Sequence, residues 1–568
     1  MLNRGEAQRN PYSNKNKTKK MKYIHTLILA LLLPVGLLAQ EKQNNFEIAK
    51  SLDIYNSLLR ELNLNYVDEI NPGELNETAI KAMLEGLDPY TVFIPESDIE
   101  NARFMTTGEY GGIGALIQYD GEFTRISETY YGWPAQKAGL IAGDVLIEVN
   151  GTDCKKKNTQ EVSELLKGQP GTEVTLKVKR YGQEKPLEIK LKREKVKIDN
   201  IPYYKVFDNG IAYLSLSGFT RDVAKELKEK FVEMQKNNEL KGFILDLRGN
   251  GGGLMNEAVD IVNLFIPKGK PVVSMRGKSA TSNNLYPTTN EPVDLDIPLA
   301  ILVDGNSASA SEIVAGAIQD YDRGVIIGTR TFGKGLVQNI LPLSYNTQMK
   351  VTVAHYYIPS GRCIQEIDYS HKKDTTQAKT DTLGKPFKTL GGRTVYEGHG
   401  ITPDVKVTRN PYATVTAYLY ARNLIFDYAN KFYSEHKTID SAAAFQIDEV
   451  TFQDFMKFVK EKNFTYTTES EKTIEKLKKT AKEEGYLEKI QPQIDLLEKN
   501  LAAEKANDLV SNRKDIEELL RSEIVSRYYF QKGRIVASLK DDPDLERAFE
   551  ILLNTNGKDE YHSILSGK

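Results

Sequence analysis

The stretch IPLAILVDGNSASASEIVAGAIQD, Ile297–Asp320, passes from an apolar run through a polar loop into a helical pattern. IPLAILV is a short continuous apolar run, which is typical of a buried strand, and EIVAGAIQD has the apolar spacing of a helix. Three serines, Ser307, Ser309 and Ser311, lie at the junction. A strand–loop–helix junction directs backbone N–H groups and the positive end of the helix dipole towards one point. The stretch therefore predicts an α/β core in which a serine can lie beside an oxyanion site.

Strand and helix patterns alternate on both sides of this stretch, over residues 200–408. GIAYLSLSGF, GFILDLRG and GVIIGT are typical of strands, whereas DVAKELKEKFVEMQKN and GLMNEAVDIVNLFI are typical of helices. Such alternation predicts a stacked βαβ core.

The serines have two interpretations. Asn306, Ser307 and Ser309 are all good N-cap residues, and Ser309 with Glu312 three positions later fits a capping box. The other interpretation is that one serine is a nucleophile beside backbone donors that stabilise an oxyanion. Taken alone, the stretch favours capping.

Two further stretches carry residues that a serine nucleophile requires. In DLRGNGGGLM, Asp246–Met255, three successive glycines follow a buried strand, and glycines let a backbone approach an anion with its N–H groups. The stretch lacks the Lys and Ser/Thr of a phosphate-binding loop, so an oxyanion-hole loop suits it better. In GTRTFGKGLVQ, Lys334 lies between two glycines, and a lysine acts as a general base once its pKa falls. Gln338 lies four residues on, on the same face of a strand.

Alternatives to these assignments remain. Taken alone, Lys334 is a surface lysine, and His355 or His399 is an alternative base for a Ser-His pair. The chain has six histidines and two cysteines, Cys154 and Cys363. This is too few for a disulfide framework, and no local cluster suggests a structural zinc site.

The remaining parts of the chain have distinct patterns. Residues 1–39 contain a basic stretch, KNKTKKMK, and then an apolar one, TLILALLLPVGLLA, which together predict a signal peptide and export to the periplasm or cell envelope. Cleavage after Ala39 would place Leu37 at position −3, where signal peptides have a small residue. Because leucine is not small, an uncleaved membrane anchor is the alternative. Residues 44–107 predict a helical segment for packing or dimerisation. Residues 108–194 predict a small module of short strands with helices near 134–138 and at 159–166.

Residues 410–568 are rich in Lys and Glu and mostly helical in pattern, which predicts a regulatory or interaction domain. Over the whole chain, 40% of residues are hydrophobic, 27% are charged and the formal net charge is −2. This balance produces no strong field that would favour nucleic acid as a partner.

Several short motifs follow one another along the chain. They are LDPYTVFIP (87–95), GEYGGIG (108–114), WPAQKAGLIAGDVLIEVNG (133–151), LDLRGNGGGL (245–254), SASASE (307–312), TFGKGLVQ (331–338), IPSGRCIQ (358–365) and GITPDV (400–405). In this order, over residues 45–407, they resemble the motifs of the carboxyl-terminal processing peptidases, or tail-specific serine proteases. The resemblance implies an α/β multidomain protein with a ClpP/crotonase-like βαβ core and an inserted PDZ domain.

The same resemblance implies a Ser-Lys dyad without cofactor or metal. Ser309 would be the nucleophile, Lys334 the base that takes its proton, and Gln338 the group that holds Lys334. The oxyanion hole would be formed by the N–H of Ala310 and that of Gly252 or Gly253. Asp320 would have a supporting role, and with Ser309 in catalysis we expect Ser307 to cap the helix and Ser311 to be a helix residue.

The PDZ domain would bind the free C-terminus of a protein or peptide substrate that ends in a nonpolar residue. Gly112, Ile113 and Gly114, in the loop Gly111–Gly114, would receive the carboxylate on backbone N–H groups. The nearby YYGWPAQKAGL departs from the family by its aromatic residues. The sequence leaves open whether the protein forms a homo-oligomer. The rival interpretations are a PDZ-bearing scaffold on an inactive core and a sugar- or nucleotide-binding α/β protein, the latter lacking a phosphate loop.

Overall fold

The computed structural model describes residues 44–369, 384–408, 410–554 and 559–567. The predicted signal segment, residues 1–39, lies outside the described residues. The chain divides into two compact units, one reaching to Leu87 and the other beginning at Asp88. In the described ranges, no helix combines the length and the apolar character that are needed to cross a membrane.

The first unit is helical, as predicted. Residues 44–65 form a helix, and α2 (Pro72–Glu85) follows a break at Asn71. The Asn71 side chain accepts hydrogen bonds from the N–H groups of Gly73 and Glu74, so it caps α2.

The second unit is built on a six-stranded sheet with the strand order β10-β11-β12-β15-β16-β21. The strands from β11 onward are parallel, and β10 is antiparallel to β11. Helices cover both faces, which explains why the strand sequences are continuous apolar runs. The strands are β10 (Tyr203–Val206), β11 (Ile211–Ser215), β12 (Gly242–Asp246), β15 (Leu299–Val303), β16 (Val325–Gly328) and β21 (Val405–Lys406).

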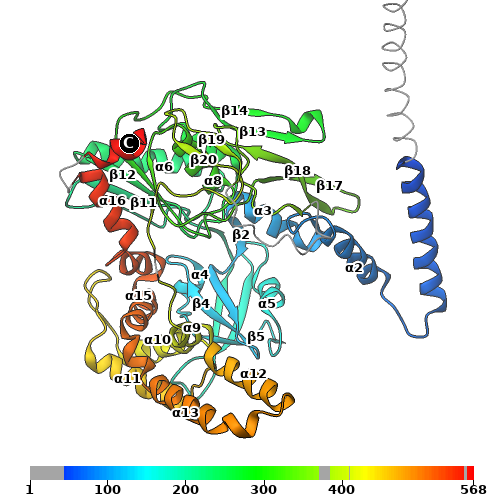
Figure 1. Cartoon of the computed structure of the whole chain (residues 1–568). Coiled ribbons are helices and arrows are strands. Elements are labelled where there is room, and N and C mark those ends of the chain that lie inside the picture. The colour runs from blue at the N-terminus through cyan, green and yellow to red at the C-terminus, as the bar shows by residue number, and fades with distance from the viewer. Residues whose placement is uncertain (1–43, 370–383, 409, 555–558, 568) are drawn as a thin grey trace, which may run out of the picture. The chain divides into compact units, whose positions relative to one another are not determined.

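The two faces of this sheet are covered by helices from different parts of the chain. On one face lie α6 (Val223–Asn237), α7 (Met255–Val262) and α8 (Ala310–Asp320), which confirm the predicted βαβ alternation. On the other face lie α16 (Pro543–Leu553) and α17 (Glu560–Ser566), from the end of the chain. Figure 1 shows α16, in red, beside β11 and β12.

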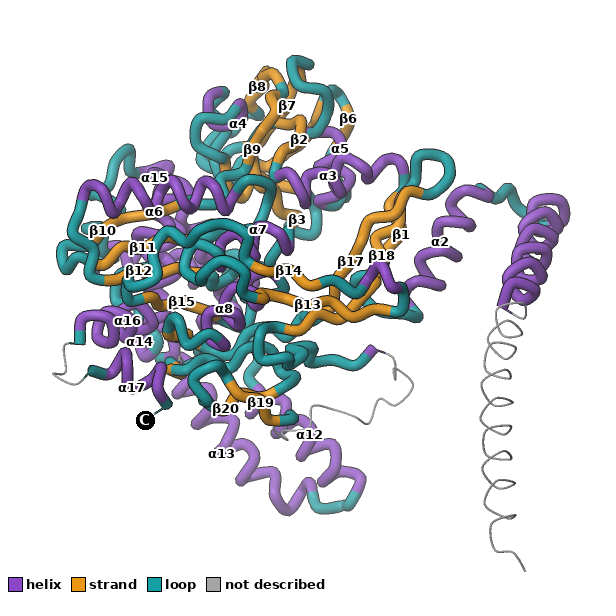
Figure 2. Tube along the Cα trace, turned by 90° about the horizontal axis from the view of Figure 1, so that it is seen from above, coloured by secondary structure: helices purple, strands orange, loops and turns teal. Residues whose placement is uncertain are grey.

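A second, antiparallel sheet adjoins the core. In it β18 pairs with β1, β13 and β17, and β13 also pairs with β14. Figure 2 shows β13, β17 and β18 extending together from the core. Its strands are β1 (Val92–Ile94), β13 (Pro271–Gly277), β14 (Leu285–Pro287), β17 (Leu336–Pro342) and β18 (Gln348–Tyr357), and the short pair β19 (Pro386–Lys388) and β20 (Thr394–Tyr396) lies apart from it.

The module at 108–194 has its own apolar core and the predicted short helices, α4 (Pro134–Lys137) and α5 (Thr159–Leu166). It follows the short helices η1 (Glu96–Asp98) and α3 (Ile99–Thr107). Its strands are β2 (Glu109–Gly112), β3 (Ala115–Tyr119), β4 (Thr124–Thr129), β5 (Val145–Val149), β6 (Thr152–Asp153), β7 (Glu173–Lys179), β8 (Leu187–Lys192) and β9 (Glu194–Lys197).

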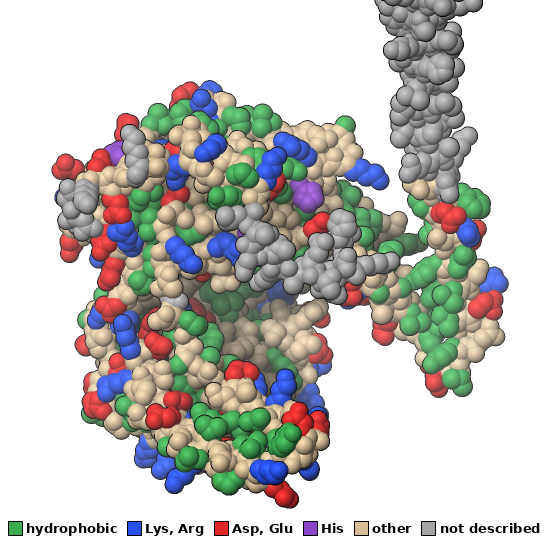
Figure 3. Space-filling view, viewed as in Figure 1, with side chains coloured by type: hydrophobic (Ala, Val, Ile, Leu, Met, Phe, Trp, Pro, Cys, Tyr) green, Lys and Arg blue, Asp and Glu red, His purple; other side chains and the backbone are tan. Residues whose placement is uncertain are grey.

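The C-terminal region is helical, as predicted, and packs around a separate apolar core rich in phenylalanine and tyrosine. On the face shown in Figure 3, acidic and basic side chains are intermixed, in keeping with a net charge of −2. The helices are α9 (Thr414–Ala421), α10 (Leu424–Glu435), α11 (Glu449–Glu461), α12 (Glu469–Glu483), α13 (Leu487–Ala506), α14 (Asp508–Ser511) and α15 (Arg513–Ser538). In the peptidase core, a 3-10 turn, η2 (Ala280–Ser282), connects β13 and β14.

Candidate active site

Ser309 lies at the N-cap of α8, directly after the loop that follows β15. Its backbone has φ 56° and ψ −112°, a conformation that a residue with a Cβ adopts at a cost. Strain of this kind persists where the surrounding structure enforces it, and it concentrates at functional sites. The conformation places the half-buried Ser309 side chain at the positive end of the helix dipole.

One of the roles predicted for the three serines is wrong, because Ser309, not Ser307, is the N-cap residue. The buried Ser307 hydroxyl instead donates to the Leu247 carbonyl oxygen (2.8 Å), which ties the loop to the end of β12. Ser311 is a helix residue as expected, and its hydroxyl donates to the Asn250 carbonyl oxygen (2.9 Å).

The glycine loop after β12 lies directly against Ser309. A Cβ added to Gly252 would come within 2.7 Å of the Ala308 carbonyl oxygen and 2.9 Å of both the Ala310 nitrogen and the Ser309 Cβ. The Gly252 N–H donates to the Asn250 side-chain oxygen (2.9 Å). In the described ranges, the N–H groups of Ala310 and Gly253 have no hydrogen-bond partner. Both N–H groups are therefore free to donate to a bound anion.

A buried carboxylate, Glu312, joins the serine to the lysine loop. Its oxygens accept hydrogen bonds from the N–H groups of Ser309 (2.8 Å), Gly333 (2.7 Å) and Lys334 (2.9 Å) and from the Thr331 hydroxyl (2.6 Å). Burial raises the pKa of Glu312 to about 7, although these hydrogen bonds act in the opposite direction. Ser309 and Glu312 form the predicted capping box at the start of α8, and the Glu312 N–H also bonds to the Ser309 carbonyl oxygen (2.9 Å).

The Lys334 amine is held in a partly buried position. Its Nζ lies 4.3 Å from the centroid of the Tyr90 ring. Burial, together with the positive charge of Lys350, lowers the pKa of Lys334 to about 8, whereas Glu312 and Asp88 oppose that shift. At pH 7 a neutral fraction of roughly a tenth is therefore present, and a general base acts in that neutral form.

The side chains of the predicted dyad are not hydrogen-bonded to each other in this structure. In the part of the chain that the structure describes, Lys334 Nζ forms no hydrogen bond with Ser309 or Gln338. The Gln338 amide nitrogen donates to the Thr352 hydroxyl (3.2 Å). The backbones are nevertheless bridged, because the Tyr356 hydroxyl lies 2.7 Å from the Lys334 carbonyl oxygen and 3.1 Å from that of Ser309.

The alternative bases and the predicted acid lie in other surroundings. His355 is exposed on β18. Neither His355 nor His399 hydrogen-bonds to Ser309, all three being described residues. Asp320, at the end of α8, is buried in an ion pair with Arg362 (3.0 Å), so its contacts hold the segment after β18.

Sequence reasoning did not assign roles to several residues that line this site. Tyr90 contacts the amine, and Asp88 is bonded to the Thr91 hydroxyl (2.8 Å) beside it. Both belong to LDPYTVFIP, so the signal was present as part of a motif. Tyr356 carried no such signal, because it stands within an ordinary strand pattern.

The predicted carboxylate loop of the strand module is tightly packed. Gly114 has φ 75°, and a Cβ there would lie 2.4 Å from the Cβ of Trp133. The Ile113 carbonyl oxygen accepts from the Ala135 N–H (2.7 Å). Burial raises the pKa of Tyr110 to about 12, against the opposing effect of hydrogen bonds from the Gly114 and Ala115 N–H groups. The Gly114 and Ala115 N–H groups therefore face the Tyr110 hydroxyl.

Three family models match successive parts of the chain. The model described as "Peptidase family S41" matches residues 210–371, "PDZ domain" matches 126–180, and "Probable PDZ-protease, C-terminal helical domain" matches 415–552. These matches confirm the predicted peptidase core, PDZ domain and helical C-terminal domain.

Individual relatives cover a larger share of the chain. The carboxy-terminal-processing protease of Bartonella bacilliformis is 34% identical over 340 residues, which is 59% of this chain and 77% of that protein. A probable CtpA-like serine protease of Staphylococcus aureus is 36% identical over 309 residues, 53% of this chain and 60% of that protein. Among solved structures, the photosystem II D1 C-terminal processing protease is 28% identical, covering 63% of this chain and 94% of that one, with a TM-score of 0.35.

Proposed function

Since this chain belongs to peptidase family S41, with a carboxy-terminal-processing protease among its relatives, we propose that it is a serine endopeptidase that cleaves proteins near their C-termini. The observation that carries the proposal is the Glu312 carboxylate, which receives the N–H groups of both Ser309 and Lys334. One buried carboxylate thereby bridges the backbones of the proposed nucleophile and the proposed base.

In the proposed reaction, neutral Lys334 takes the proton of the Ser309 hydroxyl as its oxygen attacks the carbonyl carbon of the scissile peptide. The N–H groups of Ala310 and Gly253 stabilise the oxyanion that forms. Collapse of this intermediate releases the amine, which takes the proton from Lys334, and leaves an acyl group on Ser309. Water, deprotonated by Lys334, then hydrolyses the ester and regenerates the serine.

The proposed active arrangement requires a side-chain movement. Lys334 would leave the Tyr90 ring and turn towards Ser309, and the Gln338 side-chain oxygen would then accept from the ammonium that forms. The present bond from Gln338 to Thr352 is a single contact at 3.2 Å, so exchanging it costs little.

We propose that the PDZ domain selects the substrate. The loop Gly112–Gly114 would bind the terminal carboxylate on backbone N–H groups, displacing the Tyr110 hydroxyl, and the tail would pair with β3 as an added strand. A nonpolar last residue would pack beside the loop. The basic and apolar stretches in residues 1–39 support export to the periplasm or cell envelope as the site of action.

The dyad is tested with single variants of the full chain and a protein substrate that ends in an apolar tail. We expect Ser309→Ala to abolish cleavage and Lys334→Ala to reduce kcat by about 10²- to 10⁴-fold, as loss of a general base does. His355→Ala is the control and should keep full activity. If Lys334→Ala cleaves as well as the unaltered protein, or if His355→Ala is the inactive variant, the dyad is wrong.

A further inference from the structure

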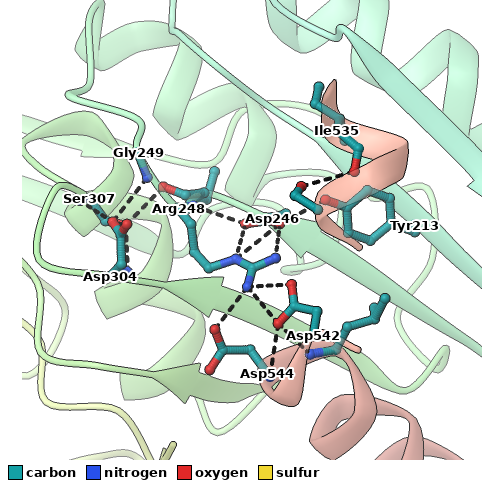
Figure 4. Close-up of polar contacts among 12 residues, drawn as sticks. Tyr213, Asp246, Arg248, Gly249, Asp304, Ser307, Ile535, Asp542 and Asp544 are labelled. Atoms are coloured by element: carbon teal, nitrogen blue, oxygen red, sulfur yellow. Dashed lines mark hydrogen bonds and ion pairs between the residues drawn. The ribbon is translucent and has the colours of Figure 1, made fainter. Parts of the chain in front are cut away.

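Arg248 lies in the glycine loop, two residues before Asn250, and its guanidinium is surrounded by three buried carboxylates. It forms ion pairs with Asp246 (2.6 Å), Asp542 (2.7 Å) and Asp544 (2.8 Å). Figure 4 shows Arg248 pointing between these side chains. Arginine suits such a position, because its planar fork of donors serves several acceptors at once.

Two of the three carboxylates come from the end of the chain. Asp542 is the N-cap of α16 and accepts from the Asp544 N–H (3.0 Å), and Asp544 lies in the first turn of that helix. The apolar face of α16 packs on the face of the sheet opposite α8, through side chains such as Leu545 and Ala548. The ion pairs therefore connect the loop beside the nucleophile to a helix on the other side of the sheet.

The position of Arg248 is transmitted to the nucleophile through short hydrogen bonds. The N–H of the next residue, Gly249, donates to Asp304 Oδ1 (2.9 Å), which also accepts from the Ser307 N–H (3.0 Å), as Figure 4 shows. The Asn250 carbonyl oxygen accepts from the Ala308 N–H (3.0 Å). A shift of Arg248 would therefore displace both the glycine loop and the residues that lead into Ser309.

Charge makes this arrangement sensitive to the loss of any member. A buried carboxylate needs a counter-charge, and a buried cation loses its position when its partners are removed. The pKa of Arg248 is raised well above its ordinary value by the adjacent carboxylates, so the guanidinium remains charged. A purely structural role as helix cap would account for Asp542 alone. It would not explain why Asp544 also points towards Arg248.

We propose that Asp542 and Asp544 are positioning residues for the oxyanion loop, and that the helix α16 is in this sense part of the catalytic apparatus. This inference rests on the proposed function. The two aspartates never touch the substrate; they hold Arg248, and Arg248 holds the loop that carries Gly253. The oxyanion donors reach their working position only while α16 is docked on the sheet.

The test compares Asp544→Asn with Glu546→Gln, which removes an exposed carboxylate from the same turn of the same helix. For each full-length variant, kcat and KM are measured on the apolar-tailed substrate, together with the unfolding temperature and the affinity for a peptide boronic acid. The boronic acid forms a tetrahedral adduct with the serine, so its affinity reports on the oxyanion hole. We expect Asp544→Asn to lower kcat by roughly 10- to 100-fold, the effect of a small displacement at a reacting centre.

Asp544→Asn should also weaken boronic acid binding by a similar factor and leave KM and the folded fraction at the assay temperature unchanged. The control, Glu546→Gln, should change none of these quantities. Unchanged kcat, or a loss that only follows the unfolded fraction, would overturn the inference. Should Asp544→Asn fail to fold, Arg248→Lys is the second variant, because it keeps the buried charge but cannot span three carboxylates. Full kcat in Arg248→Lys would likewise overturn the inference. Cleavage that survives in Ser309→Ala contradicts the proposed function instead, whatever Asp544→Asn does.

Discussion

Glu312 joins the proposed nucleophile and the proposed base through their backbones. Its carboxylate receives the N–H groups of Ser309 and Lys334, and burial raises its pKa to about 7. When ionised, it favours the charged form of Lys334, whereas Lys350 favours the neutral form. The pKa of Lys334, about 8, is thus a balance between burial with one neighbouring cation and the opposing carboxylates.

This balance predicts the effect of Lys350 on the pH dependence of the reaction. Replacing Lys350 with Met removes a positive charge near Lys334, so the pKa of Lys334 rises. Because the base works in its neutral form, the rising limb of kcat/KM against pH should move to higher pH than in the unaltered protein. Lys350→Arg keeps the charge and should leave the limb in place. A limb that stays fixed, or moves to lower pH, in Lys350→Met would show that another group is the base.

The glycine loop is the element on which the proposed oxyanion site depends. Gly252 has φ 99° and lies against Ser309 and Ala310, so no side chain fits there. Gly251, its neighbour, has open space where a Cβ would be, and it is not among the residues with positive φ. The three successive glycines therefore have different requirements, which the sequence alone does not distinguish.

Gly252→Ala and Gly251→Ala form a matched pair. The first forces a Cβ against backbone atoms at a positive φ, so we expect a stability loss of about 1–3 kcal/mol and a displaced oxyanion loop. Its kcat should fall at least tenfold, roughly the cost of a mild misplacement at the reacting centre. Gly251→Ala should retain wild-type kcat and unfolding temperature. Equal kcat in both variants would remove the glycine loop from the mechanism.

The helices and strands that could be predicted from the sequence are those whose patterns lie within a few neighbouring residues. The strands around Ser309 are continuous apolar runs, and α5 is capped by Asn158, whose side chain forms a capping box with Glu161. Both are properties of neighbouring residues. The assignment of the cap to Ser307 was wrong because that hydroxyl is bonded to Leu247, which follows β12 and is distant in sequence. Contacts between distant segments leave no periodic signal.

At the scale of the whole molecule, the same reasoning explains what was missed. The ion pairs of Arg248 with Asp542 and Asp544 and the contact of Lys334 with Tyr90 each join segments far apart in sequence. The charge-rich pattern after residue 410 predicted helices correctly. It did not indicate that α16 would complete the peptidase core. An amphipathic pattern shows that one face of a helix is buried, but it does not show against which part of the protein.

Within the unit that begins at Asp88, the PDZ domain is also fixed to the helical C-terminal domain. The buried Arg125 on β4 forms an ion pair with Asp427 on α10 (2.8 Å), and Gln118 donates to Asn423 (3.0 Å). A third contact joins Glu128 to Arg534 on α15 (3.3 Å). The C-terminal domain therefore contacts both the proposed substrate-binding module and, through α16, the catalytic core.

The central claim is that Ser309 forms an acyl-enzyme with a tail-bearing protein. It is tested by quenching a reaction of the full chain with such a substrate in acid and mapping the acyl group by mass spectrometry. The account predicts an adduct on the peptide that contains Ser309, its absence in Ser309→Ala, and its slower formation in Lys334→Ala. An acyl group on another residue, or cleavage at the normal rate in Ser309→Ala, would contradict the account.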